Sequence, residues 1–247
     1  MVGPATALSQ LNRPDGSAAY KCPATGYNIL CAVNGPVELP ARRDALKPEE
    51  ATVEVFVKPG TTTAGVAERC VEGILRSVLG KVILGREKGF PRRGVVITLA
   101  IAGGENLERG DSYLTILPAL LHAALLAMIS ASIPLAMTFS AALFGVTKTG
   151  EIVRDPSPAT AKAAVSLHVL AISSKNHLLL TESEGRFDFD TWERVHQQAL
   201  SVCQGAPSAD GDVSMGEGTA SASLHGVIRE AVEDQIYSDY AYKLDSI

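Results

Sequence analysis

The chain has 247 residues, 46% of them hydrophobic, which is enough to bury a substantial core in one large domain or two small ones. Its formal net charge of -5 argues against a free-standing nucleic-acid-binding protein, because such proteins normally present a net basic face. The four cysteines lack any paired metal-ligand spacing, and no signal peptide precedes them. This pattern favours reduced thiols in a cytosolic or nuclear protein.

The N-terminal third is predicted to start with a loose terminus, residues 1–11, and a turn at Arg13–Gly16, where Pro and Asp-Gly favour chain reversal. Two strands should follow, Gly26–Pro36 and Ala51–Pro59, and the charged loop between them predicts an antiparallel pair. From Gly65 to Leu84 apolar residues recur at three- and four-residue spacing, which is typical of an amphipathic helix lying on a sheet.

The stretch from Phe90 to Ser130 is predicted to be the centre of the fold. Gly94–Ala102 is continuously apolar, which predicts a strand buried on both faces. Ser112–Ser130 has no charged residue and predicts an enclosed helix, with Ser112 or Thr115 as N-cap and Pro118 near its first turn. Lipid enclosure is disfavoured, because polar residues and a proline interrupt a segment that barely reaches spanning length. We expect His122 to be a hydrogen-bonded core histidine, since no second His or Cys lies at helical spacing.

The C-terminal half is predicted to contain four strands and two helices. The strands are Leu135–Val146, Glu151–Arg154, Ala163–Ile172 and His177–Thr181, and the helices are Thr191–Val202 and Leu224–Tyr242. Two prolines after Asp155 should stop the second strand. The Gly/Ser-rich segment 204–221 is interpreted as a disordered insertion, because only one helix follows it. The sequence therefore predicts a single α+β domain over residues 1–247, built as a layer sandwich.

Five short motifs occur in one colinear order between about residues 11 and 203, and each is weak alone. They are Arg13-Pro14-Asp15-Gly16, Val33-Asn34-Gly35-Pro36-Val37-Glu38, Leu75-Arg76-Ser77-Val78, Phe90-Pro91-Arg92 and Val153-Arg154-Asp155-Pro156-Ser157. Together they make the chain resemble the RNase PH family, and within it the RNase PH-like ring subunits of the eukaryotic RNA exosome. The resemblance implies an RNase PH-like (ribosomal protein S5 domain 2-like) β-α-β-α layer sandwich.

Active members of this family use inorganic phosphate to attack the 3′-terminal phosphodiester of RNA. The resemblance implies a phosphate-binding Gly-Thr/Ser-Arg turn at the N-terminus of the core helix. The matching positions here are Gly110, Asp111 and Ser112, so a carboxylate stands where phosphate would bind and would repel it. Arg109, one residue before the turn, is a disfavoured substitute for the missing arginine, because bidentate geometry is strict.

The family also uses a pair of aspartates for acid/base chemistry or a divalent metal. Asp155 matches the first, but no Asp or Glu occurs between Pro156 and Thr181. We interpret Asp155 as a turn-former, since it precedes a proline. The prediction is a lost catalytic site with no metal and no cofactor; the alternative is an active phosphate-dependent 3′-5′ exoribonuclease.

The predicted RNA-binding residues are Arg86, Lys88, Arg92 and Arg93, at a corner that in ring members tends to face the channel for single-stranded RNA. The alternative is a solvated cluster that complements a helix dipole. A self-contained RNA-binding module is disfavoured by the net acidity and by the absence of an aromatic stacking array.

The resemblance implies a non-catalytic ring subunit that supports rRNA processing, RNA surveillance and mRNA turnover in the nucleus, nucleolus and cytoplasm. The implied partners are other RNase PH-like ring subunits, OB/KH-type cap subunits, a hydrolytic nuclease and single-stranded RNA, with no membrane. Residues 51–58 and 177–181 are the candidate edge strands for pairing with ring neighbours.

Overall fold

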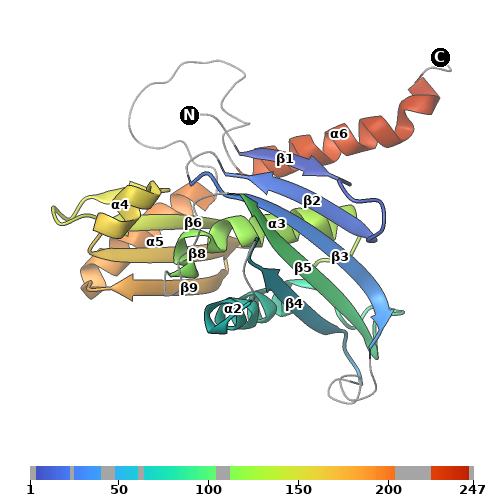
Figure 1. Ribbon diagram of the computed structural model, residues 1–247, viewed down its shortest axis with the longest axis horizontal. Coiled ribbons are helices and arrows are strands. Elements are labelled where there is room, and N and C mark those ends of the chain that lie inside the picture. Colours follow the sequence, from blue (N-terminus) through green and yellow to red (C-terminus); the bar gives the residue numbers. More distant parts are fainter. Residues whose placement is uncertain are drawn as a thin grey trace.

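The computed structural model describes residues 4–22, 25–39, 48–60, 64–103, 112–203 and 224–244. Two sheets lie on either side of a central helix, and a further helix covers the outer face of the second sheet (Figure 1). This order of sheet, helix, sheet and helix confirms the predicted layer sandwich. The predicted insertion at 204–221 lies outside the described residues.

The first sheet has the order β1-β2-β3-β5-β4. Its strands are β1 (Ala5–Leu8), β2 (Gly16–Lys21), β3 (Asn28–Glu38), β4 (Thr52–Lys58) and β5 (Arg93–Gly103). The predicted antiparallel pairing of residues 26–36 with 51–59 is wrong, because β5 lies between β3 and β4. β4 runs parallel to β5, and a parallel neighbour needs a long crossover, which helix α2 (Val66–Val82) provides.

The N-terminus is also more ordered than predicted. Ala5–Leu8 is a strand paired with β2, and the turn at 13–16 leads directly into that strand. The Asp15 carboxylate accepts a hydrogen bond from the Gly35 backbone N–H at 2.8 Å, which ties the turn to β3. Gly16 has a packing role, because a Cβ there would clash with the backbone of Ala131.

Strand β5 is buried on one face only, so the prediction of burial on both faces is wrong. Val95, Ile97 and Leu99 are fully buried against the helices, whereas the alternating residues Val96 and Thr98 remain partly exposed. The continuous apolar run reflects small and β-branched side chains that fit a half-covered strand.

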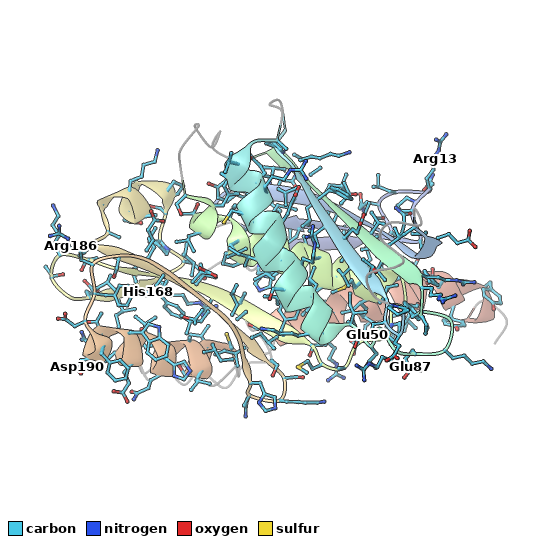
Figure 2. All side chains as sticks on the ribbon, turned by 90° about the horizontal axis from the view of Figure 1, so that it is seen from below. Arg13, Glu50, Glu87, His168, Arg186 and Asp190 are labelled. Atoms are coloured by element: carbon cyan, nitrogen blue, oxygen red, sulfur yellow. The ribbon has the colours of Figure 1, made fainter. Side chains whose placement is uncertain are left out.

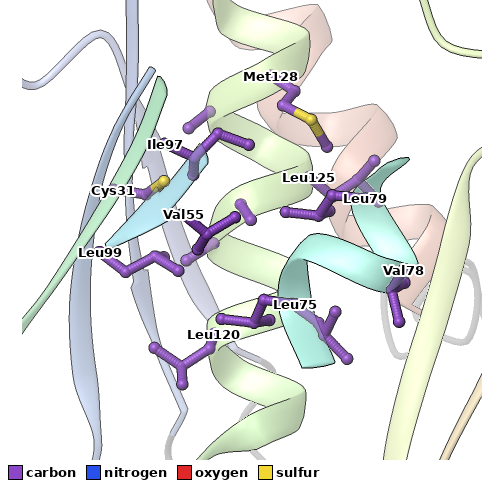
Figure 3. Close-up of a cluster of buried hydrophobic side chains, with 14 of the residues drawn as sticks. Cys31, Val55, Leu75, Val78, Leu79, Ile97, Leu99, Leu120, Leu125 and Met128 are labelled. Carbon is purple, nitrogen blue, oxygen red and sulfur yellow. The ribbon is translucent and has the colours of Figure 1, made fainter. Parts of the chain in front are cut away.

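The central helix α3 (Leu117–Ser130) is buried on every side from Leu117 to Met128. It contacts β2, β3 and β5 on one side and β6 and β8 on the other. Figure 3 shows Leu125 of α3 beside Leu79 of α2, with Val55 and Ile97 of the first sheet against the same helices. Within the described ranges, no helix is both long and apolar enough to span a membrane. Protein, rather than lipid, surrounds this apolar helix.

The second sheet has the order β7-β6-β8-β9. Its strands are β6 (Phe139–Val146), β7 (Ile152–Arg154), β8 (Ser166–Ser173) and β9 (Leu178–Gly185). β6 starts four residues later than predicted, and an unpredicted short helix, α4 (Pro158–Ala163), occupies the predicted start of β8. Ser157 begins α4, because its hydroxyl accepts the Thr160 N–H.

Helix α5 (Phe189–Cys203) buries Val195, Ala199 and Cys203 against the outer face of the second sheet, so every residue of β6 is buried. Helix α6 (Leu224–Leu244) packs through Val227 and Ile228, and its predicted acidic face is exposed. The segments predicted to lie at sheet edges correspond to β4 and β9, and both are edge strands.

Candidate functional site

The phosphate turn implied by the resemblance is described only at Ser112, since Arg109, Gly110 and Asp111 lie outside the described residues. Ser112 is the N-cap of a short 3₁₀ helix, η1 (Tyr113–Thr115), that precedes α3. Its hydroxyl accepts the Leu114 N–H at 3.3 Å, so Ser112 caps η1. The Leu114 N–H therefore already has a partner, whereas an anion bound at this helix start would need that N–H as its donor. The prediction that Ser112 or Thr115 caps the core helix is wrong, because the N-cap of α3 is Ile116.

A carboxylate that the sequence analysis missed, that of Glu68, lies beside this turn. The Tyr113 hydroxyl donates to Glu68 Oε1 at 2.6 Å, and the Gly65 N–H donates to Glu68 Oε2 at 2.6 Å. Burial, followed by the hydrogen bond to Glu68, raises the pKa of Tyr113. The available signal was the spacing Gly65-x-x-Glu68, which matches the acidic position of a capping box. Because Glu68 contacts Tyr113, the residue next to Ser112, its buried carboxylate weakens any phosphate site there.

Asp155 occupies the turn after β7 with a left-handed backbone, φ 47°, a region that Asp tolerates better than most residues. Its N–H donates to the Leu143 carbonyl, and Arg154 Nε donates to its carboxylate at 3.2 Å. Burial raises the pKa of Asp155, and the Arg154 guanidinium opposes that shift. The positive φ and these contacts support the turn-forming interpretation.

The acidic residues of β9 do not supply the second catalytic aspartate. Glu182 pairs in register with Val169, and Glu184 with Leu167. β9 and β7 form opposite edges of the second sheet, with β6 and β8 between them. Three strand spacings separate the β9 carboxylates from Asp155 by about 14 Å, too far for a carboxylate pair.

All four predicted RNA-binding residues are exposed around the turn that leads into β5. The structure pairs Arg86 with Glu50, because Arg86 Nε and Nη2 both donate to Glu50 Oε1 at 2.8 and 2.6 Å. Glu50 and Glu87 lie close together at this corner (Figure 2). Arg93 faces Glu38 across the β3–β5 pair. The corner is therefore less basic than its sequence indicates.

The basic corner and Ser112, the described residue of the phosphate turn, lie toward opposite ends of β5. Arg93 begins the strand, whereas Tyr113, next to Ser112, contacts Glu68 in the first turn of α2, which follows the carboxyl end of the parallel strand β4. Ten residue steps of an extended strand span about 33 Å. Any RNA contact at the corner is thus separate from the implied phosphate position.

His122 is a satisfied core histidine, as predicted. Its Nε2 accepts the Ala141 N–H at 3.0 Å, and its Nδ1 lies 3.1 Å from the Tyr20 hydroxyl. A backbone N–H can only donate, so the ring carries its proton on Nδ1 and donates it to Tyr20. Ala141 lies beyond the stretch of β6 that pairs with β7, and His122 satisfies its backbone N–H.

We expect the buried ring of His168, in β8, to make the free energy of unfolding depend on pH. The ring is fully buried between the Ser166 and Ser183 hydroxyls, at 3.0 and 2.8 Å, and burial lowers its pKa. As pH falls below about 6.5, the unfolded chain binds a proton that the folded chain resists, so stability decreases by up to about 1.4 kcal/mol per pH unit. Urea unfolding between pH 7.5 and 5.5 should therefore show a steeper loss for wild type than for His168→Gln. Parallel curves would contradict this, and His177→Gln, on an exposed turn, is the control.

Among the described residues, no group of three or more His, Cys, Asp or Glu side chains is placed to hold a metal ion. Cys31 and Cys203 are buried in the two hydrophobic clusters, Cys22 is half-buried and Cys70 is exposed. All four thiols are free.

Comparison with known proteins identifies exosome components as relatives, although no family model matches the chain. Exosome complex component RRP46 of Saccharomyces cerevisiae is 31% identical over 202 residues, which cover 78% of this chain and 87% of the relative. The exosome complex exonuclease RRP46 homolog of Oryza sativa subsp. japonica is 31% identical over 150 residues, covering 60% of this chain and 57% of the relative.

Two solved structures share the fold. The crystal structure of rice (Oryza sativa) Rrp46 superimposes with a TM-score of 0.70 at 24% identity, covering 81% of this chain and 88% of the rice chain. A chain of the Archaeoglobus fulgidus exosome with RNA bound to the active site gives a TM-score of 0.59 at 14% identity, covering 81% and 85% of the two chains. With the RRP46 relationship extending over most of both sequences, the chain belongs to the RRP46 family of RNase PH-fold exosome complex components.

Proposed function

We propose that this chain is a non-catalytic structural subunit of the RNA exosome core ring, where it supports 3′-to-5′ RNA processing and degradation. The observation that carries the proposal is the 31% identity to an exosome complex component over 202 residues. A ring subunit needs a stable framework and free edges for its neighbours, and this fold has both.

The absence of catalysis is supported by charge at the position of the phosphate turn. Asp111 introduces a carboxylate in the sequence, and Glu68 holds a second, buried one beside Tyr113. Residues 156–181 offer no acidic partner for Asp155. Two fixed anions near the turn and a missing acid/base partner disfavour phosphorolysis.

The second candidate function is an active phosphate-dependent 3′-5′ exoribonuclease. It is favoured by the presence of Asp155 and by the rice relative, whose name describes an exonuclease. The two candidates differ in one measurable property, the release of nucleoside diphosphates from RNA.

Ring membership is tested by co-expression with RNase PH-like ring proteins. β9 is the more accessible predicted edge, because on β4 the Val57 N–H already donates to the buried Glu72 at 3.0 Å. We expect the isolated chain to self-associate, and to become soluble and melt at higher temperature with its neighbour, by mass action on the folded state.

A pair of exposed leucines sharpens this test. Leu178, at the start of β9, is 40% exposed, and Leu11, outside β9 and near the N-terminus, is 37% exposed. Leu178→Glu should reduce co-purification with the neighbour, whereas Leu11→Glu should not. A monodisperse monomer whose melting temperature is indifferent to every ring protein would contradict ring membership.

The basic corner is proposed to contact RNA in the ring channel through Lys88, Arg92 and Arg93, while Arg86 is held by Glu50. Arg92→Glu with Arg93→Glu should weaken RNA passage through the assembled ring. If both side chains contact phosphates, the salt dependence of log K should decrease by about 1.4. The fold should be unaffected, since both charges are exposed.

The matched control for the corner reverses two exposed cations away from both the corner and β9, Lys148→Glu with Lys162→Glu. An unchanged RNA footprint and salt slope in the Arg92/Arg93 variant would favour the helix-dipole interpretation instead.

The proposal also includes further partners and a location. The partners are OB/KH-type cap subunits and a hydrolytic nuclease, and affinity purification of a tagged chain tests them. The location is the nucleus, nucleolus and cytoplasm, and imaging of the tagged chain tests it.

A further inference from the structure

Helix α5 carries a ladder of three stacked aromatic rings on its surface. The rings of Phe189 and Trp192 lie 6.1 Å apart with 24° between their planes, and those of Trp192 and His196 lie 5.3 Å apart with 9° between theirs. Phe189 is 72% exposed, and the other two rings are half-buried. This aromatic ladder therefore presents flat ring surface to solvent.

Core packing does not account for the ladder. The buried side of α5 consists of Val195, Ala199 and Cys203, which pack on the second sheet. Phe189 belongs to neither buried hydrophobic cluster. Exposed aromatic rings have a negative face that attracts cations.

The charges beside the ladder are negative. Glu193 lies four residues after Phe189 and three before His196, the spacings at which side chains on a helix are neighbours. Asp188 and Asp190 add two exposed carboxylates at the N-terminal end of the helix.

The nearby cations are directed elsewhere. Arg194 lies on the opposite side of the helix by its angular position, and its Nη2 donates to Thr191 Oγ1 at 3.4 Å. Figure 2 shows Arg186 projecting from the neighbouring edge, away from α5, whereas Asp190 lies on its first turn. The surface thus combines π faces with carboxylates and suits a cationic partner.

We propose that the aromatic ladder and its carboxylates bind an arginine side chain presented by an extended segment of a partner protein. A guanidinium is planar, stacks on aromatic faces and donates in parallel to one carboxylate, so it can use the exposed ring of Phe189 together with Glu193. Lysine has the charge without the planar stacking surface. The sequence predicts no aromatic stacking array, and the aromatic ladder corrects that prediction. RNA is still disfavoured as its partner, because the same carboxylates repel phosphates. This inference does not depend on ring membership.

The test uses the only tryptophan of the chain, Trp192, as an intrinsic probe. The full-length protein is titrated with a blocked Gly-Arg repeat peptide, the matched Gly-Lys and Gly-Glu peptides, and oligouridylate. We expect a saturable change in Trp192 fluorescence with the Gly-Arg peptide, binding several-fold weaker for Gly-Lys, and no response to Gly-Glu or oligouridylate.

Variants confirm the location, with labelled-peptide anisotropy as readout. Phe189→Ala and Glu193→Gln should each weaken Gly-Arg binding by about threefold to tenfold, the range of a cation–π or exposed ionic contact. Arg194→Gln, on the opposite side of α5, should leave binding unchanged. Equal affinity for the arginine and lysine peptides, insensitivity to Phe189→Ala, no binding by either readout, or displacement by oligouridylate would each overturn the proposal.

Discussion

The purified chain, incubated with RNA, inorganic phosphate and Mg²⁺, is expected to release no nucleoside diphosphates. The phosphate turn reads Gly110-Asp111-Ser112, without the family's arginine, and Ser112 already accepts the Leu114 N–H. At an effective dielectric of about 20, two like charges 4 Å apart repel by about 4 kcal/mol, which is a factor of roughly a thousand in phosphate affinity. Thin-layer separation of labelled nucleotides measures the outcome directly.

Asp155→Ala is the matched control, because it removes the family aspartate that this chain retains. Wild type and variant should both be inactive. Phosphate-dependent shortening that Asp155→Ala abolishes would contradict the structural role and support the exoribonuclease. Rebuilding the turn with Asp111→Thr and Ser112→Arg should not restore activity, because the second carboxylate remains missing.

His122→Ala is expected to be among the most destabilising single substitutions in this fold. It leaves the Ala141 N–H and the Tyr20 hydroxyl without their ring partner inside the core, and it opens a cavity. An unsatisfied buried donor and a ring-sized cavity together destabilise by roughly 3–5 kcal/mol. Urea denaturation followed by Trp192 fluorescence gives the free energy of unfolding.

Two further variants test the cause of this loss of stability, one by removing a single partner of His122 and one as a surface control. Tyr20→Phe removes only the hydroxyl that faces His122 Nδ1 and should decrease stability by about 1–3 kcal/mol. His177→Ala, on an exposed turn, should stay within about 0.5 kcal/mol of wild type. A loss below about 1 kcal/mol for His122→Ala would mean that the backbone N–H of Ala141 finds another partner.

Local signals in the sequence were sufficient for several elements. The three- and four-residue spacing of apolar residues located α2 within two residues at each end, and the uncharged run after Ser112 located the buried helix α3. The prolines after Asp155 correctly ended β7 at Arg154. Together with the colinear motifs, these signals determined the fold class and the family, because capping, periodicity and proline chemistry act within a few residues.

Tertiary structure alone decided how distant segments pair and which charges remain available. β4 joined β5 in parallel, because α2 carries the chain across the helical layer before β5 begins, and no local signal distinguishes this from a hairpin. Glu68 reached Tyr113 across 45 positions, and Glu50 reached Arg86 across 36. These pairings add an anion beside the phosphate turn and neutralise part of the basic corner. Sequence could not reveal them, because a side-chain contact between remote segments depends on the packing of every layer between them.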